Sequence, residues 1–199
     1  MGNCIWPFLS NGTKVSLTID ILLYSAAEVG DLLEVSRLLV LGANPNSINP
    51  VSGKNSIEIA CVNGNLDLLT KFAQHGINLA ISGGLLFLAV QYGHVDIVRY
   101  LISIGADVNE HFGLTTILIE GLKNHEITKL LLEAGADVNE NIPLLECIKN
   151  GFKDSFDLLL KHGASVYTSD NDITPLGYAT LHNKLEFIEK LSNLGYNTL

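Results

Sequence analysis

The sequence predicts an all-α solenoid in which short helix-turn-helix units are stacked side by side. Six glycines recur at similar intervals along the 199-residue chain, and each of them follows a short apolar segment. They are Gly42, Gly76, Gly105, Gly135, Gly163 and Gly195. Because self-similarity with a period of roughly 30 residues is the sequence signature of repeat architectures, we predict about six repeats, each closed by one of these glycines.

Each repeat is predicted to contain two helices joined by a tight turn. A second series of glycines precedes the closing series by the length of one helix. It consists of Gly30, Gly64, Gly93 and Gly151. Between the two series the apolar residues have a helical period. In the clearest copy, Val95, Val98 and Leu101 fall on one face of a helix.

Two kinds of side chain recur inside these helices and predict the core. The first helices share a small residue, which allows the two helices of a repeat to approach closely. These residues are Ala26, Ala60, Ala89, Cys147 and Ala179. The second helices share a large apolar residue just before the closing glycine. These residues are Leu38, Phe72, Leu101, Leu131, Leu159 and Leu191.

The closing glycines predict how each second helix ends. Glycine has no Cβ, so it adopts the left-handed conformation that follows many helices without strain. An Asp or Asn comes next in the best copies, as in Asp107 and Asn109 after Gly105. Such side chains hydrogen-bond to nearby backbone groups, so we expect them to rigidify the connection to the next repeat.

Several segments resemble ankyrin repeats. Thr174-Pro175-Leu176-Gly177-Tyr178-Ala179 resembles the signature T-P-L-H-x-A, with Gly177 in place of the histidine. Ile142–Cys147 is a looser copy, and Gly93–Val98 followed by Ala106–Asn109 is similar to the second helix and its exit. The resemblance covers about residues 21–199. It implies an ankyrin-repeat solenoid of stacked helix-turn-helix units.

The repeats depart from the typical ankyrin period of about 33 residues, because several of them are shorter. The missing residues fall between the closing turn and the next first helix, so short or trimmed β-hairpin loops are expected before repeats three, four and five. In repeat four, Thr115-Thr116-Ile117 is one residue out of step with Lys123-Asn124-His125, which indicates a one-residue deletion. Repeats of this shortened kind resemble those of giant DNA viruses and intracellular bacteria.

The two ends of the repeat array are predicted to be capped. Residues 1–20 do not repeat and are expected to form an N-terminal extension or cap, in which Trp6-Pro7-Phe8-Leu9 folds over repeat one. Thr18 or Asp20 is expected to N-cap the first helix. The ankyrin-repeat domain would then span residues 21–199, with Ser192 contributing to a polar C-terminal end.

Composition argues against several classes of function. The net charge of −9, with few and scattered Lys and Arg residues, argues against nucleic-acid binding and against docking on anionic lipid. No apolar run is long enough to span a bilayer. The three cysteines are odd in number and widely spaced, which predicts neither a disulfide framework nor a zinc site and favours the cytoplasm.

Chemistry-bearing residues likewise predict no enzyme. The six histidines fall at scattered repeat positions, so no metal or other cofactor is expected. The rival reading, an enzyme or small-molecule receptor, requires a polar pocket with a convergent acid, base or nucleophile, and no motif of this kind is present. Cys61 and Cys147 are expected to be buried packing residues of first helices.

We therefore predict a non-catalytic adaptor or scaffold that binds a protein partner. A monomer is expected, because no apolar surface is left over. The resemblance implies binding on the concave face and hairpin tips. The first-helix candidates are Val62, Asn63, Gln91, Tyr92, Leu122, Lys123, Lys149, Asn150, Leu181 and His182. The tip candidates are His111, Phe112 and Leu114. Tyr92, His111 and Phe112 are expected to form one central patch, because aromatic residues are enriched at binding hot spots. The alternative for Phe112 is packing within its hairpin.

The alternative function is an acylated, membrane-tethered adaptor, or an effector that a virus or an intracellular bacterium directs into the host cytoplasm. Gly2 is a candidate for myristoylation and Cys4 for palmitoylation, which together give the two signals that stable anchoring needs. However, Trp6 stands where the myristoylation motif has Ser or Thr.

Overall fold

The computed structural model describes residues 13–81, 84–167 and 173–194 of the chain. Contacts divide the chain into two compact units, Met1–Leu79 and Ala80–Leu199. The described residues form twelve helices, which pair as six helix-turn-helix repeats, and one two-stranded sheet. The predicted all-α architecture is confirmed at this level.

The first unit contains two repeats. Repeat one consists of α1 (Thr13–Val29) and α2 (Leu32–Val40), and repeat two of α3 (Ser56–Val62) and α4 (Leu66–Gln74). Helix α1 packs against both α2 and α3, and α2 also packs against α4. First helices therefore lie against first helices, and second helices against second helices.

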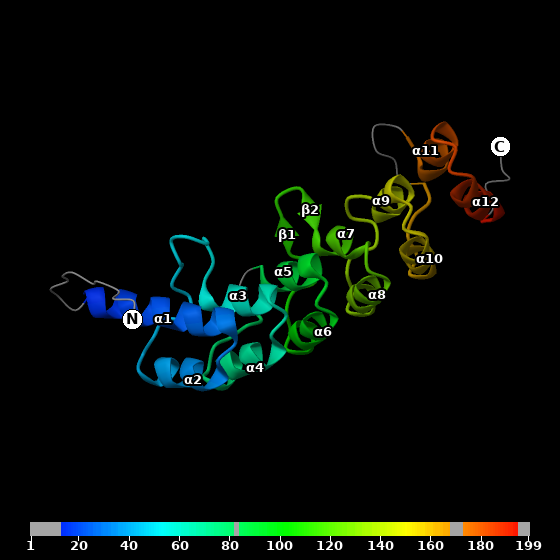
Figure 1. The fold of residues 1–199 in the computed structure, drawn as a ribbon. Coiled ribbons are helices and arrows are strands. Elements are labelled where there is room, and N and C mark those ends of the chain that lie inside the picture. The colour runs from blue at the N-terminus through cyan, green and yellow to red at the C-terminus, as the bar shows by residue number, and fades with distance from the viewer. Residues whose placement is uncertain (1–12, 82–83, 168–172, 195–199) are drawn as a thin grey trace. The chain divides into compact units, whose positions relative to one another are not determined.

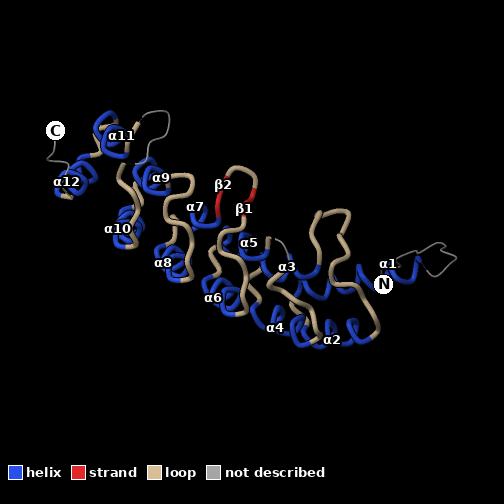
Figure 2. Tube along the Cα trace, turned by 180° about the vertical axis from the view of Figure 1, so that it is seen from behind, coloured by secondary structure: helices blue, strands red, loops and turns tan. Residues whose placement is uncertain are grey.

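The second unit continues the same arrangement over four repeats. They are α5 (Leu85–Tyr92) with α6 (Val95–Ser103), α7 (Ile117–Gly121) with α8 (His125–Glu133), α9 (Pro143–Asn150) with α10 (Lys153–Lys161), and α11 (Pro175–Leu181) with α12 (Leu185–Asn193). Figure 1 shows α5, α7, α9 and α11 in one row of this unit and the second helices in another. Before α7, the strands β1 (His111–Phe112) and β2 (Thr115–Thr116) form an antiparallel hairpin, drawn in red in Figure 2.

The closing glycines end the second helices as predicted. Gly42, Gly76, Gly105, Gly135 and Gly163 all have a left-handed backbone, with φ of +88°, +83°, +91°, +92° and +86°. The amide that follows each glycine donates to the carbonyl of the large apolar residue of that helix, as from Ala106 N to Leu101 O at 3.0 Å. This bond satisfies a carbonyl that the helix end would otherwise leave unpaired. Gly195 lies outside the described residues.

The predicted core is confirmed. The six large apolar residues of the second helices are at most 1% exposed. The small residues of the first helices are also buried, from Ala26 at 5% to Ala60 at 0%. The helices of a repeat can therefore bury one apolar face against each other and against the neighbouring repeat of the same unit.

Repeat four has a shortened inner turn, as predicted, but it lacks two residues and not one. Its two helix N-caps, Thr116 and Asn124, are eight residues apart, whereas Asn55 and Asn65 of repeat two are ten apart. Four inner turns contain a left-handed glycine, and the turn of repeat six uses Asn183 with φ of +53°. In repeat four α7 ends at Gly121, Asn124 already caps α8, and no residue between them has a positive φ. The small residue of this first helix is Gly121, which is buried.

Helix α1 is longer than predicted. It begins at Thr13, so Thr18 and Asp20 lie inside the helix and the prediction that one of them caps it is wrong. Asp20 is instead buried, at 7% exposed, and its carboxylate accepts a hydrogen bond from Asn44 N at 2.7 Å.

The bond from Asn44 to Asp20 has counterparts between later repeats. Asn109 accepts from Asp137 N at 2.8 Å, and Asn139 accepts from Ser165 N at 2.7 Å. In each case the acceptor belongs to the repeat before the donor. In repeat one, Asp20 of the lengthened α1 takes the role of that preceding asparagine.

Candidate protein-binding surface

The hairpin before repeat four presents the most exposed apolar side chain described. His111 pairs with Thr116 and Phe112 with Thr115, and the turn between them contains Gly113, with φ of +64°, and Leu114. Leu114 is 99% exposed. The expected trimming therefore leaves a short hairpin in this connection, with an apolar residue at its tip.

The base of the hairpin is fixed by an aromatic contact. The Phe112 ring is half-buried and stacks on Phe87 of α5, with ring centroids 4.5 Å apart and planes 25° apart. A Cβ on Gly84 would lie 3.2 Å from Phe112 Cε1, so a glycine leaves room for this ring. Phe112 therefore packs against the preceding first helix, whereas the alternative interpretation expected it to pack within its own hairpin. Sequence reasoning missed Phe87, although the apolar run of α5 contains it.

Polar contacts tie the same hairpin to the following connection. His111 Nε2 lies 3.1 Å from Glu140 Oε1, and the His111 side chain remains 55% exposed. Asn109 donates from Nδ2 to Gly135 O at 3.2 Å while its Oδ1 accepts from Asp137 N. The strands that present Leu114 are thus held in place before a partner binds, which lowers the entropy cost of binding.

Most of the first-helix candidates lie on the surface. The exposed residues are Asn63, Gln91, Tyr92, Lys123, Lys149, Asn150, Leu181 and His182, and Val62 is half-buried. Leu122 is the exception, since it is only 1% exposed, and the expectation that it is a surface residue is wrong. The shortened turn of repeat four brings Leu122 into the interior, where its carbonyl accepts a hydrogen bond from Ser155 Oγ at 2.6 Å.

Two of the exposed candidates also join neighbouring repeats. Lys123 Nζ donates to Gln91 O at 3.1 Å, and Asn63 Nδ2 donates to Glu28 O at 3.1 Å. Each acceptor is a carbonyl at the end of a first helix, where the helix itself leaves carbonyls unpaired. Substitution of Lys123 or Asn63 would therefore disturb packing as well as the surface.

Tyr92 and the hairpin occupy two ends of α5. Tyr92 is 49% exposed at the last residue of the helix, and its ring is parallel to that of His94 at a centroid distance of 6.4 Å. Phe87, on which the Phe112 ring stacks, lies five residues before Tyr92, or about 8 Å along the helix axis at 1.5 Å per residue. Five residues also turn the helix by about 140°, so Tyr92 and Phe87 lie on different sides of α5.

The connections of the second unit are acidic. The connections between successive repeats carry Asp107, Glu110, Asp137 and Glu140, and their described residues include no Lys or Arg, whereas Lys123 and Lys184 lie in the turns inside repeats. Glu140, which lies 3.1 Å from His111, brings one of these acidic groups to the hairpin that presents Leu114. Negative charge there favours a partner with complementary positive groups.

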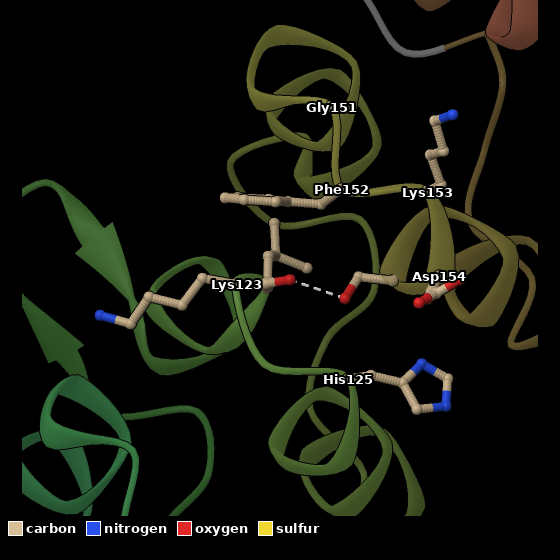
Figure 3. A pocket seen from close by; sticks show the side chains of 8 residues that line it. Lys123, His125, Gly151, Phe152, Lys153 and Asp154 are labelled. Atoms are coloured by element: carbon tan, nitrogen blue, oxygen red, sulfur yellow. Dashed lines mark hydrogen bonds between the residues drawn. The ribbon is translucent and has the colours of Figure 1, made fainter.

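A cavity of about 290 Å³ lies between repeats four and five (Figure 3). Lys123, His125, Lys153 and Asp154 line it, and in the close-up the two lysine side chains extend in different directions. Ser155, also on the wall, is 2% exposed and donates to the Leu122 carbonyl, the bond drawn as a dashed line. Its hydroxyl is therefore part of the interior packing and does not resemble an activated nucleophile.

The buried cysteines are likewise poor nucleophiles. Cys61 lies in α3 and Cys147 in α9, and both side chains are buried. Burial raises the pKa of each thiol to about 12, with a smaller contribution from Glu58 or Glu146. At neutral pH the thiolate that reacts or binds metal is therefore scarcely populated.

Nowhere in the described segments do three His, Cys, Asp or Glu side chains gather as metal ligands would. None of the described helices is both long and apolar enough to cross a membrane. The candidate acylation sites Gly2 and Cys4 lie outside the described residues.

Comparison with known proteins identifies the repeats. A family model described as ankyrin repeats (3 copies) matches residues 22–112 and, a second time, residues 114–198. The chain belongs to the ankyrin-repeat family. Ankyrin repeats are generally protein–protein interaction modules and typically non-catalytic scaffolds.

A solved ankyrin-repeat structure is similar over most of this chain. It is the crystal structure of the human ASB11 ankyrin repeat domain, with 26% sequence identity and a TM-score of 0.71. The similarity covers 88% of this chain and 84% of that one. Among curated proteins, no relative matched. The ankyrin-repeat solenoid with short hairpins that the sequence predicts is therefore confirmed.

Proposed function

We propose that this ankyrin-repeat chain is a non-catalytic adaptor, and that its second unit binds a protein partner along α5 and the hairpin before α7. Leu114 carries the proposal, because it is 99% exposed on a hairpin whose base is fixed by stacking and polar contacts. Tyr92 extends the surface along α5, with Gln91 beside it. The adjoining first-helix residues Lys123, Lys149, Asn150, Leu181 and His182 would continue it across later repeats.

The chemistry of the surface indicates what the partner presents. An exposed leucine contributes binding free energy when an apolar pocket or side chain removes it from water, at about 25 cal/mol per Å² of apolar surface. The acidic groups of the connections between repeats, Glu110 and Glu140 among them, would select a partner with Lys or Arg near that apolar group. Cys61 and Cys147 are buried thiols, one in each unit, and thiols persist in a reducing compartment such as the cytoplasm.

The test compares two matched variants in affinity purification followed by mass spectrometry. Leu114→Asp changes the hairpin tip, and Leu185→Asp makes the same change at a 69% exposed leucine of a second helix. A true partner is expected to be captured by the wild type and by Leu185→Asp and to be lost with Leu114→Asp.

Calorimetric titration with the purified partner then measures the loss. Truncation of a central hot-spot residue costs at least about 2 kcal/mol, which is roughly a thirtyfold loss of affinity. Leu114→Asp and Tyr92→Ala should each approach this loss while the far-UV spectrum stays unchanged. Equal affinities for wild type and both variants would refute this placement of the surface. Phe112→Ala is unsuitable here, because it also removes the contact with Phe87.

The acylated alternative depends on Gly2 and Cys4. Mass spectrometry of the N-terminus of the chain expressed in eukaryotic cells tests it directly. A myristoyl or palmitoyl mass increment would support a membrane-tethered adaptor, and an unmodified N-terminus would reject it.

A further inference from the structure

In α8 and α12, one face of the second helix contacts the repeat that comes before it. Glu126 of α8 accepts from Arg99 of α6 at 3.0 Å, and Lys190 of α12 reaches Asp157 of α10 at 2.8 Å. Glu186 of α12 also forms an ion pair with the preceding repeat. Glu126 and Glu186 both lie two residues after the N-cap of their helix, and Lys190 lies one turn further along the same face.

On this face α2 is apolar, unlike the second helices of the other repeats. Leu33 lies two residues after the N-cap Asp31, and it is 83% exposed. The other five repeats have an acid at this position: Asp67, Asp96, Glu126, Asp154 and Glu186. Val40, two turns later, is 77% exposed. Its counterparts are all polar: Gln74, Ser103, Glu133, Lys161 and Asn193.

Helix α1 continues the apolar face. Leu22 lies four residues before the small residue of its first helix. The residues at the same position in other repeats are all buried: Ser56, Leu85, Pro143 and Pro175. Leu22 is 49% exposed. The expectation that no apolar surface is left over is therefore wrong for repeat one. An uncovered face of this kind at the end of a repeat array is unfavourable, because terminal repeats need a shielded core and a polar exterior.

We propose that the chain's own residues 5–9, Ile5-Trp6-Pro7-Phe8-Leu9, dock on the apolar face formed by Leu22, Leu33 and Val40 and take the place of a preceding repeat. The segment contains five apolar residues, and no charged side chain occurs between Met1 and Gly12. The replacement has a parallel in the same repeat, where Asp20 already supplies the acceptor that a preceding asparagine would supply.

The length of the chain allows this docking. The bond between Asp20 and Asn44 fixes the end of α2 at the level of Asp20, about 10 Å along the helix from Thr13. Leu33 lies about 10 Å further, at the opposite end of α2. An extended chain spans at most about 3.3–3.6 Å per residue, so Trp6 can reach roughly 23–25 Å from Thr13. Residues 5–9 can therefore return along α1 and cover the whole face.

The size of the face favours a short segment over a second copy of the chain. A stable interface between two proteins takes about 20–30 residues on each side. Here three apolar residues are arranged in one strip, with the Arg37–Glu34 ion pair between Leu33 and Val40. Five consecutive apolar residues match such a strip in length.

Trp6 provides a direct test, because it is the single tryptophan of the chain. In the native full-length protein its fluorescence should be blue-shifted relative to the urea-unfolded chain and protected from acrylamide. The double variant Leu33→Asp with Val40→Gln introduces residues that other repeats carry at these positions. It should move the emission to that of the unfolded chain and abolish the protection, with the far-UV spectrum unchanged. Leu114→Asp, the matched control in the second unit, should leave the emission unchanged.

Three outcomes would overturn the proposal. The first is unfolded-like emission from the native wild type. The second is native emission that the double variant, still folded, does not alter. The third is a blue shift that appears only as the concentration rises and a dimer forms in sedimentation, which would place Trp6 against a second copy.

A second experiment does not depend on the double variant folding. In a Cys4→Ser background, Val40→Cys should react slowly with a thiol reagent. Adding Trp6→Ala and Phe8→Ala should accelerate the reaction to the rate of an exposed cysteine. Equal rates with and without the two aromatic residues would also reject the docking.

Discussion

The contact between repeats four and five depends on one buried hydroxyl, so we expect Ser155→Ala to weaken it. Ser155 is 2% exposed, and its Oγ donates to the carbonyl of Leu122, a residue that is 1% exposed, at 2.6 Å. The Thr128 hydroxyl lies 3.1 Å from Ser155 Oγ and also contacts the carbonyls of Gly121 and Asn124, each at 3.0 Å. These bonds surround the inner turn that lacks two residues, so the network joins the shortened turn to the next repeat.

The magnitude follows from the Leu122 carbonyl, which the substitution leaves without its donor. A buried acceptor without a partner costs about 1–3 kcal/mol. Alanine recovers up to about 0.5 kcal/mol, because it has a higher helix propensity than serine. The expected loss is therefore about 0.5–2.5 kcal/mol. The cavity of about 290 Å³ that Ser155 helps to line can admit water, and a water that reaches the carbonyl would place the loss at the lower end.

Thermal and urea unfolding measure this loss. For a chain of this size, about 2–4 °C in Tm corresponds to 1 kcal/mol. The control is Ser103→Ala, an exposed serine whose Oγ donates to Tyr100 O within its own helix, and its Tm should change little. If Ser155→Ala and Ser103→Ala unfold alike, the Leu122 carbonyl does not need this donor and the reasoning fails.

Three further predictions concern Asp20, Gly121 and the two buried cysteines. Asp20→Ala should lower the free energy of unfolding by about 0.5–1.5 kcal/mol in urea titrations, because the Asn44 amide loses its acceptor, whereas Asp20→Asn should retain most of the stability; equal losses would contradict this. Gly121→Ala should lower Tm, because the new Cβ would lie 2.9 Å from Leu131 Cδ1. Overpacking of this kind costs about 1–3 kcal/mol, whereas the higher helix propensity of alanine returns roughly 1 kcal/mol. An increase in Tm would contradict this prediction. Burial raises the pKa of Cys61 and Cys147 from 9.0 to about 12, so these thiols ionise in the unfolded chain before they ionise in the folded one. The urea midpoint of the wild type should therefore fall more steeply between pH 9 and pH 11 than that of the Cys61→Ala/Cys147→Ala variant. Parallel pH profiles of the two proteins would count against this.

The features that sequence predicts best here are those dictated by the local backbone. A closing glycine such as Gly105 is required because the position has φ of +91°, which a side chain disfavours. The large residue before it, such as Leu101, is required because the helix presents that position to the interior of every repeat. Both constraints act within a few residues, so they can be recognised without knowing the neighbouring repeat.

The errors arise where a residue depends on a neighbour that the pattern does not specify. Leu122 was predicted to be exposed by alignment with other repeats, but the inner turn of repeat four is two residues shorter, and Ser155 of the next repeat donates to the Leu122 carbonyl. Phe112 lies in a tip segment, yet the ring rests on Phe87 from the preceding first helix. Neither contact is periodic, because each depends on the length of one particular connection.

The repeats can therefore be compared with one another to locate changes of environment. A given position in an internal repeat faces the same neighbours each time, so physical chemistry selects the same kind of residue, as the acid two residues after the N-cap illustrates. A departure such as Leu33 indicates that the neighbour is different, and Asp20 indicates how the chain supplies a substitute. Because both departures occur in repeat one, the covering of that face has to come from outside the repeat pattern. The apolar segment before α1 is the part of this chain that lies nearest in sequence and has the composition to provide it.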